Sequence, residues 1–346
     1  MYLKDLVDIQ MGQSPDSKFY NYDKIGLPFY QGKADFGRIN PTPKIWCSKS
    51  KKEAKPNDIL ISVRAPVGDL NINNEQSCIG RGLAAITCRP DVDMMYLYYY
   101  LKYLKPQLKH ISTGSTFESI NRTQLENLII NYKPYLEQIK ISNILQVVER
   151  QIEVKENLLR LYDLLVKSRF VEMFGDPNAS RTKYKLVPIH TVTDCMVPGR
   201  DKPKSFTGEI PWITINDLNI NGYTNKSKLG LGLTIDEVKE VNRKCVPQGS
   251  VLMSCVGNLG LCSIASVDVV INQQLHSYQC NEFINNLYLM YYLSFKNTYM
   301  NKIASSTTVL YMNKNACNNI PVLLPPIELQ ISFAKYLNRI NKLKFD

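Results

Sequence analysis

The side chains that most often carry out chemistry are few and scattered in this sequence. Its three histidines, His110, His190 and His276, have no histidine, cysteine or glutamate at the spacing of a metal site. Neither the phosphate-binding pattern G-x-x-x-x-G-K-S/T nor the nucleophile turn G-x-S-x-G occurs, and no strand is followed by G-x-G-x-x-G. The Asn/Asp-Pro-Pro-aromatic motif of an amino-methyltransferase is also missing, because Asp176-Pro177 is followed by Asn178. We therefore expect a chain without catalytic residues, cofactor or metal of its own.

The cysteines and the apolar runs bear on the environment of the chain. The nine cysteines are odd in number and contain no C-x-x-C pair, so we expect reduced thiols and a cytoplasmic location. No run of about 18 apolar residues occurs, and the first residues contain no apolar signal core. These patterns predict a protein outside the membrane.

Basic residues are in excess, and the excess is unevenly distributed. The net charge is +11, with 18 basic against 13 acidic residues in 1–133 and 14 against 10 in 174–325. Residues 134–173 are neutral, with six of each sign. Two basic blocks separated by a neutral segment are compatible with a polyanionic partner such as nucleic acid. Solvated surface lysines would give the same count, so charge alone does not decide.

The neutral segment has the pattern of one long helix. No glycine or proline interrupts the residues from Pro134 to Gly175, and proline suits a first helical turn. Apolar residues recur at coiled-coil spacing from Ile141 to Val166, so this helix needs a partner helix. At 1.5 Å per residue it would reach roughly 60 Å, the length of a spacer.

An internal repeat supplies that partner. YLYYYL (96–101) matches YLMYYL (288–293) at an offset of 192, and the same offset aligns Pro134 with Pro326 and Gln138 with Gln330. Near the start of each copy the offset falls to 183, where Leu3 matches Leu186, so the second copy has about nine extra residues around 226–244.

The repeat defines the organisation. Within each copy, short β-rich runs such as 58–63 and 250–256 predict strands, and 94–101 and 285–295 predict amphipathic helices. The predicted fold class is α+β, with two repeated domains joined by long antiparallel coiled-coil helices in a pseudo-two-fold arrangement. The predicted boundaries are 1–133, first domain; 134–175, central helix; 176–325, second domain; 326–346, a shorter C-terminal helix.

Four stretches carry a family resemblance. They are KPNDILISVRAPVGDLNI (55–72), CIGRGLAAI (78–86), GSTFESINRTQLENLII (114–130) and KSRFVEMFGDP (167–177). Together they resemble the DNA-specificity subunit of type I restriction–modification enzymes, and the second repeat matches more loosely through 208–223 and 322–330. The resemblance implies two target-recognition domains, each reading one half of a bipartite site in double-stranded DNA. It further implies two methyltransferase subunits that bring S-adenosylmethionine, and a restriction or translocase subunit that can join them.

The candidate DNA contacts differ between the repeats. Arg81 lies between two glycines where its counterpart is Gln273, and Arg64 corresponds to Val256. Cationic candidates are Lys33, Arg38, Lys49, Lys51, Lys52, Arg64, Arg81, Arg200, Lys202 and Lys204, and amide candidates are Asn216, Asn258, Gln273 and Gln274. Lysines and arginines can anchor phosphates, and amides can pair with adenine. The alternatives are solvated charges, a buried salt bridge for Arg81, and local hydrogen bonds for the amides.

The central helix also offers candidate partner contacts. Because the C-terminal helix is about half as long, we expect it to leave an apolar stripe bare at Leu159, Tyr162, Val166, Phe170 and Met173. A methyltransferase subunit or a second copy of the chain would cover that stripe, unless the domains fold back over it.

Three interpretations remain at this level. The first is a non-catalytic DNA-specificity subunit, and the second is the specificity partner of a fused restriction–methylation enzyme. The third is a coiled-coil scaffold for protein assembly. Salt-dependent binding of duplex DNA separates the first two from the third, and the neighbouring genes separate the first from the second.

Overall fold

A computed structural model of the chain describes residues 1–112, 118–179, 182–199, 201–306 and 309–345. The chain divides into two compact units, Met1–Lys155 and Glu156–Asp346. The division falls inside the long helix, whereas the domain boundaries expected at 134, 176 and 326 remain predictions. In the described ranges, no helix has both the length and the apolar character needed to cross a membrane.

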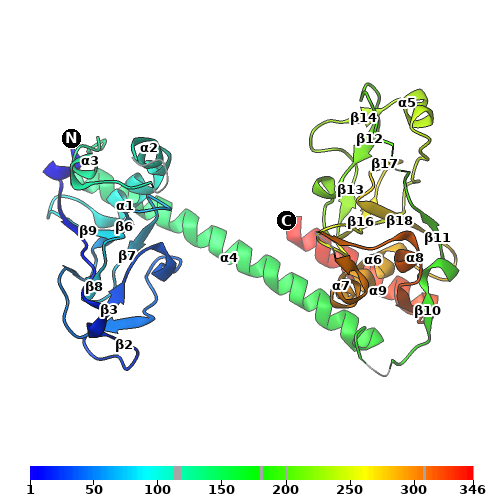
Figure 1. The fold of residues 1–346 in the computed structure, drawn as a ribbon, viewed down its shortest axis with the longest axis horizontal. Helices are drawn as coiled ribbons and strands as arrows, with labels where there is room; N and C mark the ends of the chain where they lie inside the picture. Colours follow the sequence, from blue (N-terminus) through cyan, green and yellow to red (C-terminus); the bar gives the residue numbers. More distant parts are fainter. Residues whose placement is uncertain (113–117, 180–181, 200, 307–308, 346) are drawn as a thin grey trace. The chain divides into compact units, whose positions relative to one another are not determined.

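Short strands and short helices build the first unit (Figure 1). Its strands are β1 (Val7–Met11), β2 (Tyr20–Asn21), β3 (Leu27–Tyr30), β4 (Ile45–Cys47), β5 (Glu53–Ala54), β6 (Ile59–Ser62), β7 (Leu70–Ile72), β8 (Ser77–Ile79) and β9 (Leu83–Cys88). They form an antiparallel sheet with the order β1-β9-β6-β7 and a mixed sheet with the order β2-β4-β3-β8-β5. The helices are α1 (Met94–Tyr103), α2 (Lys105–Ile111) and α3 (Arg122–Glu126), with short 3-10 turns at Leu3–Asp5, Ser17–Phe19 and Lys33–Asp35.

Strand β6 contains three consecutive apolar residues, Ile59, Leu60 and Ile61. Successive side chains of a strand point to opposite faces. Ile59 and Ile61 belong to the core that contains Leu97 and Leu101 of α1, whereas Leu60 belongs to a second core with Tyr30. Both faces of β6 are therefore covered, which explains a continuous apolar run in place of alternation.

The second unit repeats this architecture. Its strands are β10 (Leu186–Pro188), β11 (Thr193–Met196), β12 (Ile210–Ile213), β13 (Tyr223–Thr224), β14 (Gly232–Leu233), β15 (Val251–Ser254), β16 (Cys262–Ala265), β17 (Val270–Ile271), β18 (Leu275–Cys280), β19 (Ser305–Ser306), β20 (Leu310–Tyr311) and β21 (Pro321–Leu323). Its short helices are α5 (Ile235–Glu240), α6 (Asn286–Phe295), α7 (Asn297–Ile303) and α8 (Lys314–Asn318), with 3-10 turns at Ile189–Thr191 and Ile215–Asp217. The principal sheet has the order β11-β18-β15-β16-β13, and a smaller sheet has the order β14-β12-β17.

The repeat extends to strand register. Ile59 of β6 pairs with Ile86 of β9, and Val251 of β15 pairs with Tyr278 of β18, so both partners shift by 192 positions. Helix α5 lies within 226–244, where extra residues were predicted.

One sequence match is wrong. The backbone N–H of Ile189 donates to Ile320 as that of Leu3 donates to Leu128, so Leu3 corresponds to Ile189. Leu186 was the wrong counterpart because it is exposed, whereas both Leu3 and Ile189 are buried.

Two long helices follow the domains. Helix α4 spans Tyr135–Phe174 without a break, and helix α9 spans Ile327–Phe345, so both predicted helices are confirmed. At 1.5 Å per residue, the 40 residues of α4 extend about 60 Å.

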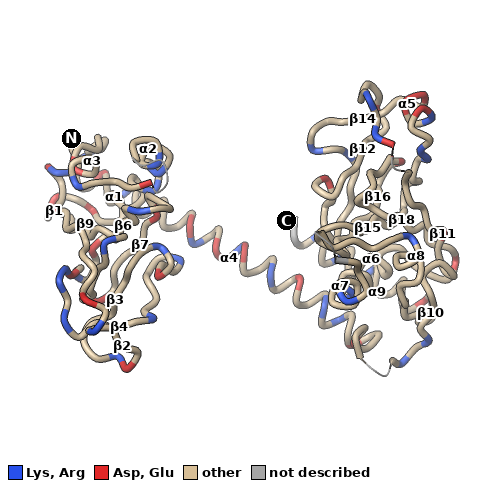
Figure 2. Tube along the Cα trace, viewed as in Figure 1, with Lys and Arg blue, Asp and Glu red and all other residues tan. Residues whose placement is uncertain are grey.

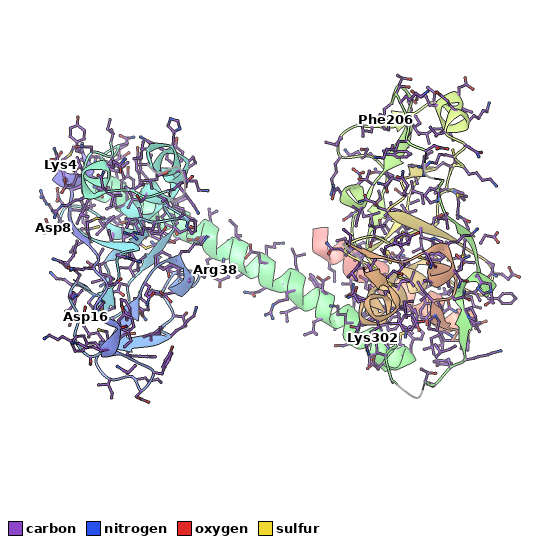
Figure 3. All side chains as sticks on the ribbon, in the orientation of Figure 1. Lys4, Asp8, Asp16, Arg38, Phe206 and Lys302 are labelled. Carbon is purple, nitrogen blue, oxygen red and sulfur yellow. The ribbon has the colours of Figure 1, made fainter. Side chains whose placement is uncertain are left out.

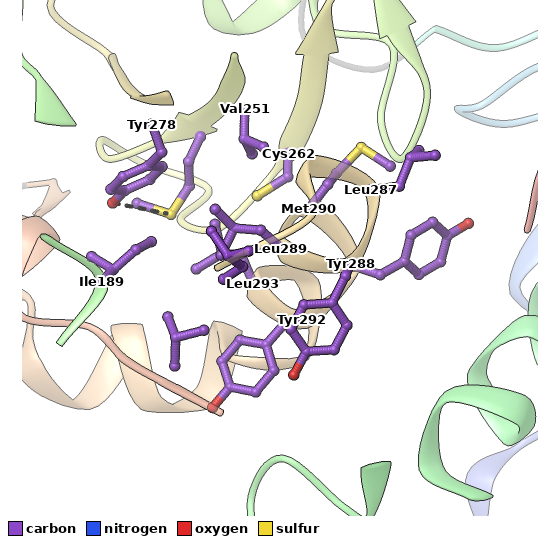
Figure 4. Packing of buried hydrophobic residues seen from close by; sticks show 14 of the residues in the cluster. Ile189, Val251, Cys262, Tyr278, Leu287, Tyr288, Leu289, Met290, Tyr292 and Leu293 are labelled. Carbon is purple, nitrogen blue, oxygen red and sulfur yellow. Dashed lines mark hydrogen bonds between the residues drawn. The ribbon is translucent and has the colours of Figure 1, made fainter. Parts of the chain in front are cut away.

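The largest core of the second unit surrounds α6. Tyr288, Leu289, Tyr292 and Leu293 pack in a cluster with residues of β15, β16 and β18 (Figure 4). The hydroxyl group of Tyr288 donates to the carbonyl of Leu323 at 2.9 Å. This follows the rule that a buried tyrosine keeps a hydrogen-bond partner for its hydroxyl group.

Candidate nucleic-acid interface

The turn that carries Arg81 is held by close backbone packing. It joins β8 to β9, and Gly80 and Gly82 flank the arginine. A Cβ atom on Gly82 would lie 2.3 Å from the carbonyl oxygen of Gln31, so only glycine fits there. The Arg81 side chain itself is exposed, and its backbone N–H donates to the hydroxyl group of Ser14 at 3.3 Å. This exposure excludes the alternative of a buried salt bridge.

Three lysines lie close to this turn. Lys49, Lys51 and Lys52 are exposed and follow β4, in a part of the first unit where Figure 2 shows several basic segments. The N–H of Ile79, at the end of β8, donates to the carbonyl of Lys52 at 3.0 Å. The structure therefore brings the lysine segment next to the Arg81 turn.

The cations of this segment also have local contacts. The ammonium group of Lys51 lies 3.1 Å from Asp16, and that of Lys49 lies 5.7 Å from the ring centroid of Phe19. Because these contacts are solvent-exposed, each contributes little to stability and leaves the charge accessible to an anion.

Lys33 and Arg38 lie on the segment between β3 and β4. The ammonium group of Lys33 is 3.0 Å from the carboxylate of Asp69, and the guanidinium group of Arg38 is 3.5 Å from Glu153 on α4. Figure 3 shows Arg38 beside that helix. Burial raises the pKa of Asp69, but hydrogen bonds from Lys105 and Lys33 outweigh it and hold that pKa below its usual value. Both cations thus have carboxylate partners within the first unit.

Arg64 occupies a third position. It is exposed at the end of β6 and forms an isolated antiparallel bridge with Ser119. It follows Val63, whose backbone N–H donates to the carbonyl of Gly82 at 2.9 Å, so Arg64 lies close to the glycine turn.

In the second unit, the amides lie on two neighbouring turns. Gln273 and Gln274 are half-buried between β17 and β18, and Asn258 is exposed between β15 and β16. The N–H and thiol groups of Cys255 both donate to the carbonyl of Gln274, which connects the two turns. The side-chain oxygen of Gln274 accepts from Asn272 at 3.0 Å, so this amide is partly engaged within its own turn.

The other candidates of the second unit lie on its exposed loops. Lys202 and Lys204 are exposed, and Lys204 lies 3.5 Å from Glu240. Asn216 is exposed in a 3-10 turn, where its carbonyl accepts from Lys228. Arg200 lies outside the described residues. Among the side chains that the structure describes, no group of three His, Cys, Asp or Glu is placed to hold a metal ion.

The expected bare stripe of α4 is wrong at two positions. Val166 and Phe170 are fully buried, and Tyr162 and Met173 are half-buried against the same core. The ring of Phe170 stacks on Tyr288 with centroids 5.6 Å apart, and meets Phe333 of α9 edge-on at 5.3 Å.

The reason is the direction of α9. Helix α4 leads into the second domain, and α9 leads out of it. In an antiparallel pair, the first turns of α9 therefore meet the last turns of α4. Leu159 remains exposed, and exposed apolar residues continue into the first unit at Leu145, Val148 and Ile152. The bare part of the seam is thus the N-terminal part.

A buried glutamine at the start of each long helix has a role that the sequence did not reveal. The side-chain oxygen of Gln138 accepts the N–H of Asp93, and its amide donates to the carbonyls of Asp91 and Lys133. Gln330 makes the same three bonds to Asn285, Phe283 and Pro325. All these positions differ by 192, and the shared offset was the signal that could have identified them.

Comparison with known proteins agrees with this architecture. The family model of the type I restriction modification DNA specificity domain matches residues 1–160 and 193–346. A protein of Methanocaldococcus jannaschii that carries the name MjaX specificity subunit is 45% identical over 148 residues, which are 42% of this chain and 35% of that protein. The MjaIX specificity subunit of the same organism is 28% identical over 185 residues, 50% of this chain and 43% of its own length.

A solved structure extends the likeness in fold to the whole chain. The S subunit of a type I restriction–modification system from M. genitalium superposes with a TM-score of 0.61 at 14% identity, covering 99% of this chain and 91% of that one. The α+β class and the two-repeat organisation predicted from the sequence are confirmed. The matched stretches span less than half the length of the two curated relatives. Because the family model matches both repeats, the chain belongs to the type I restriction–modification DNA-specificity family.

Proposed function

We propose that this chain is a non-catalytic DNA-binding component that reads a bipartite duplex target, one half-site for each repeat. The observation that carries the proposal is a pair of equivalent turns with different side chains. The β8–β9 turn presents Arg81, and the corresponding β17–β18 turn presents Gln273. An arginine suits the acceptor edge of guanine and a glutamine suits adenine, so one scaffold can read two different half-sites.

Contacts to the phosphate backbone would supply most of the affinity. Lys49, Lys51 and Lys52 are exposed beside the Arg81 turn, and Lys202 and Lys204 are exposed in the second unit. Such lysines position a protein on DNA without reading its sequence. Their release of counterions makes binding strongly dependent on salt.

The proposal includes methyltransferase subunits as partners, two of them by the symmetry of the repeat. These subunits would bring S-adenosylmethionine, and a restriction or translocase subunit could join them. The exposed apolar seam at Leu145, Val148, Ile152 and Leu159 supports a helical partner, because coiled-coil positions exposed to water are costly. A second copy of the chain is the alternative occupant of that seam.

Methylome sequencing tests the independent reading of two half-sites. The full chain is co-expressed with its methyltransferase subunit, and the methylated motif is compared for wild type, Arg81→Ala and Gln273→Ala. We expect each substitution to relax the motif in one half only, and in opposite halves. Changes in both halves from one substitution, or in neither half from both, would contradict the proposal.

A further inference from the structure

Each unit contains a groove between a loop and the long helix that follows its domain. In the first unit the groove lies between Ile39 and the α4 residues Gln146, Glu149 and Arg150, and its volume is about 120 Å³. In the second unit it lies between residues 219–223 and the α9 residues Asn338, Asn341 and Lys342, and its volume is about 600 Å³.

The two grooves occupy the same place in the repeat. Gln146, Glu149 and Arg150 precede Asn338, Asn341 and Lys342 by 192 positions each. The loops also correspond. The carbonyl of Ile39 accepts from Ile72 at 2.7 Å, and that of Gly222 accepts from Ile264 at 2.9 Å, with the two donors again 192 positions apart. Their difference in volume is therefore a difference between equivalent sites.

Two carboxylates that line the first groove, Glu149 and Glu153, are held in ion pairs of the chain itself. Arg38 reaches from the loop to Glu153 at 3.5 Å, and Lys102 contacts Glu149 at 2.8 Å. The hydroxyl group of Tyr99 donates to Glu149 at 2.7 Å. Burial raises the pKa of Glu149, but the hydrogen bonds from Lys102 and Tyr99 lower it further, so this carboxylate stays charged.

Among the described residues, no ion pair of this kind lines the second groove. Asn341 stands where α4 has Glu149, so the carboxylate that collects the cations of the first groove is replaced by a neutral amide. Lys342 is exposed and forms no ion pair with any side chain that the structure describes.

Helix α9 carries further basic residues outside the groove. Lys335, Arg339 and Lys342 follow at spacings of four and three, which places them on one helix face. All three are exposed, and within the described part of the chain none has a carboxylate partner. No acidic residue occurs between Glu328 and Asp346.

The first repeat lacks this stripe. The positions of α4 equivalent to Lys335, Arg339 and Lys342 are Asn143, Val147 and Arg150, so two of the three charges are absent there. Repeat symmetry does not require the cations on α9, and the packing of α9 does not use them, because its core contacts run through Phe333, Leu337 and Ile340.

We propose that the basic stripe of α9, Lys335, Arg339 and Lys342, together with the open groove, binds the phosphate backbone of duplex DNA. This rests on the proposed function and adds a contact on the C-terminal helix, outside the recognition loops. Three unpaired cations on one helix face match a polyanion, and the amides of Asn338 and Asn341 can donate to phosphate oxygens. The first repeat, whose groove is lined by the carboxylates Glu149 and Glu153, has no matching contact.

The test is a salt titration of duplex binding by the full chain. The stripe variant carries Lys335→Gln, Arg339→Gln and Lys342→Gln, and the matched control carries Lys140→Gln, Arg150→Gln and Lys155→Gln on α4. All six residues are exposed, so both variants should fold, and circular dichroism checks this. Each lost phosphate contact lowers the slope of log K against log salt by about 0.9. We expect this slope to fall by roughly 2–3 in the stripe variant and to change little in the control.

A second variant addresses the groove. Asn341→Glu places in the second groove the carboxylate that the first groove has at Glu149. We expect it to weaken duplex binding about as much as removing one cation of the stripe, severalfold at 0.1 M salt. Asn341→Gln, which keeps the amide, should bind as the wild type does.

The outcomes separate this inference from the proposed function. If the wild-type chain shows no salt-dependent duplex binding, the proposed function fails. If the wild type binds but the stripe variant keeps its slope, or the control loses as much, only the contact on α9 is refuted. An unchanged slope with loss of the methyltransferase subunit in co-purification would make the stripe a protein interface and overturn the inference.

Discussion

Replacing Gln330 by alanine should destabilise the second unit without affecting the first. The side chain is fully buried, and its removal leaves one N–H and two carbonyl groups without partners, at Asn285, Phe283 and Pro325. An unsatisfied buried polar group costs about 1–3 kcal/mol, so the expected loss is about 3–5 kcal/mol of unfolding free energy, allowing for partial rescue by water. Domains have only about 5–15 kcal/mol in total, so this loss is large.

The two tryptophans make the assay specific for each unit. Trp46 lies in the first unit and Trp212 in the second, and they are the only tryptophans of the chain. In a Trp46→Phe background, urea unfolding followed by the fluorescence of Trp212 reports on the second unit. Gln151→Ala, an exposed position on α4, is the matched control and should change stability by less than about 0.5 kcal/mol. A loss below about 1 kcal/mol for Gln330→Ala would refute the assigned role of this glutamine.

Three further predictions concern charge, pH and packing. Arg81→Ala should weaken binding of a duplex that carries the target by about 1–3 kcal/mol while leaving the unfolding free energy within about 0.5 kcal/mol, as fluorescence anisotropy and urea unfolding can measure. Burial lowers the pKa of His276 to about 4, and the imidazole stays neutral in the fold. The unfolded chain then binds more protons between that value and the ordinary pKa of about 6.5, so stability should fall as pH drops through this window, and His276→Gln should flatten the dependence. Phe170→Ala should cost the second unit about 3–5 kcal/mol, whereas Leu159→Asp should leave stability nearly unchanged and reduce self-association in light scattering.

The repeat made the fold predictable, because one constant offset relates residues that must occupy the same place. Strands β6 and β15 and helices α1 and α6 follow from matched apolar runs, and the long helix follows from a stretch without glycine or proline. The offset failed at Leu186, because the residue equivalent to Leu3 lies three positions later in the chain. A single leucine match cannot reveal such a shift. Ile189, the residue that is buried in place of Leu3, differs from it in type.

The candidate site was less predictable, because charge and exposure are set by contacts distant in sequence. Arg81 could be singled out from its two glycines, which the structure explains by their approach to Gln31. The partners of Lys33 and Arg38, Asp69 and Glu153, lie 36 and 115 positions away, and no local pattern announces such pairs. Amphipathic spacing likewise predicts that the Val166 side chain is buried, but it does not identify the residues that cover it.

The position of the bare seam follows from connectivity. A helix that leaves a domain starts beside the helix that enters it, so α9 covers the last turns of α4, and its 19 residues end long before the 40 residues of α4 are covered. The exposed seam therefore falls on the part of α4 that belongs to the first unit, at Leu145, Val148 and Ile152. A partner helix that occupies this seam would contact the same stretch of α4 that carries Glu149 and Glu153, the carboxylates that bind Lys102 and Arg38. Partner binding and the attachment of the first domain to its helix would then share one segment of about two turns, so a substitution at either should affect both.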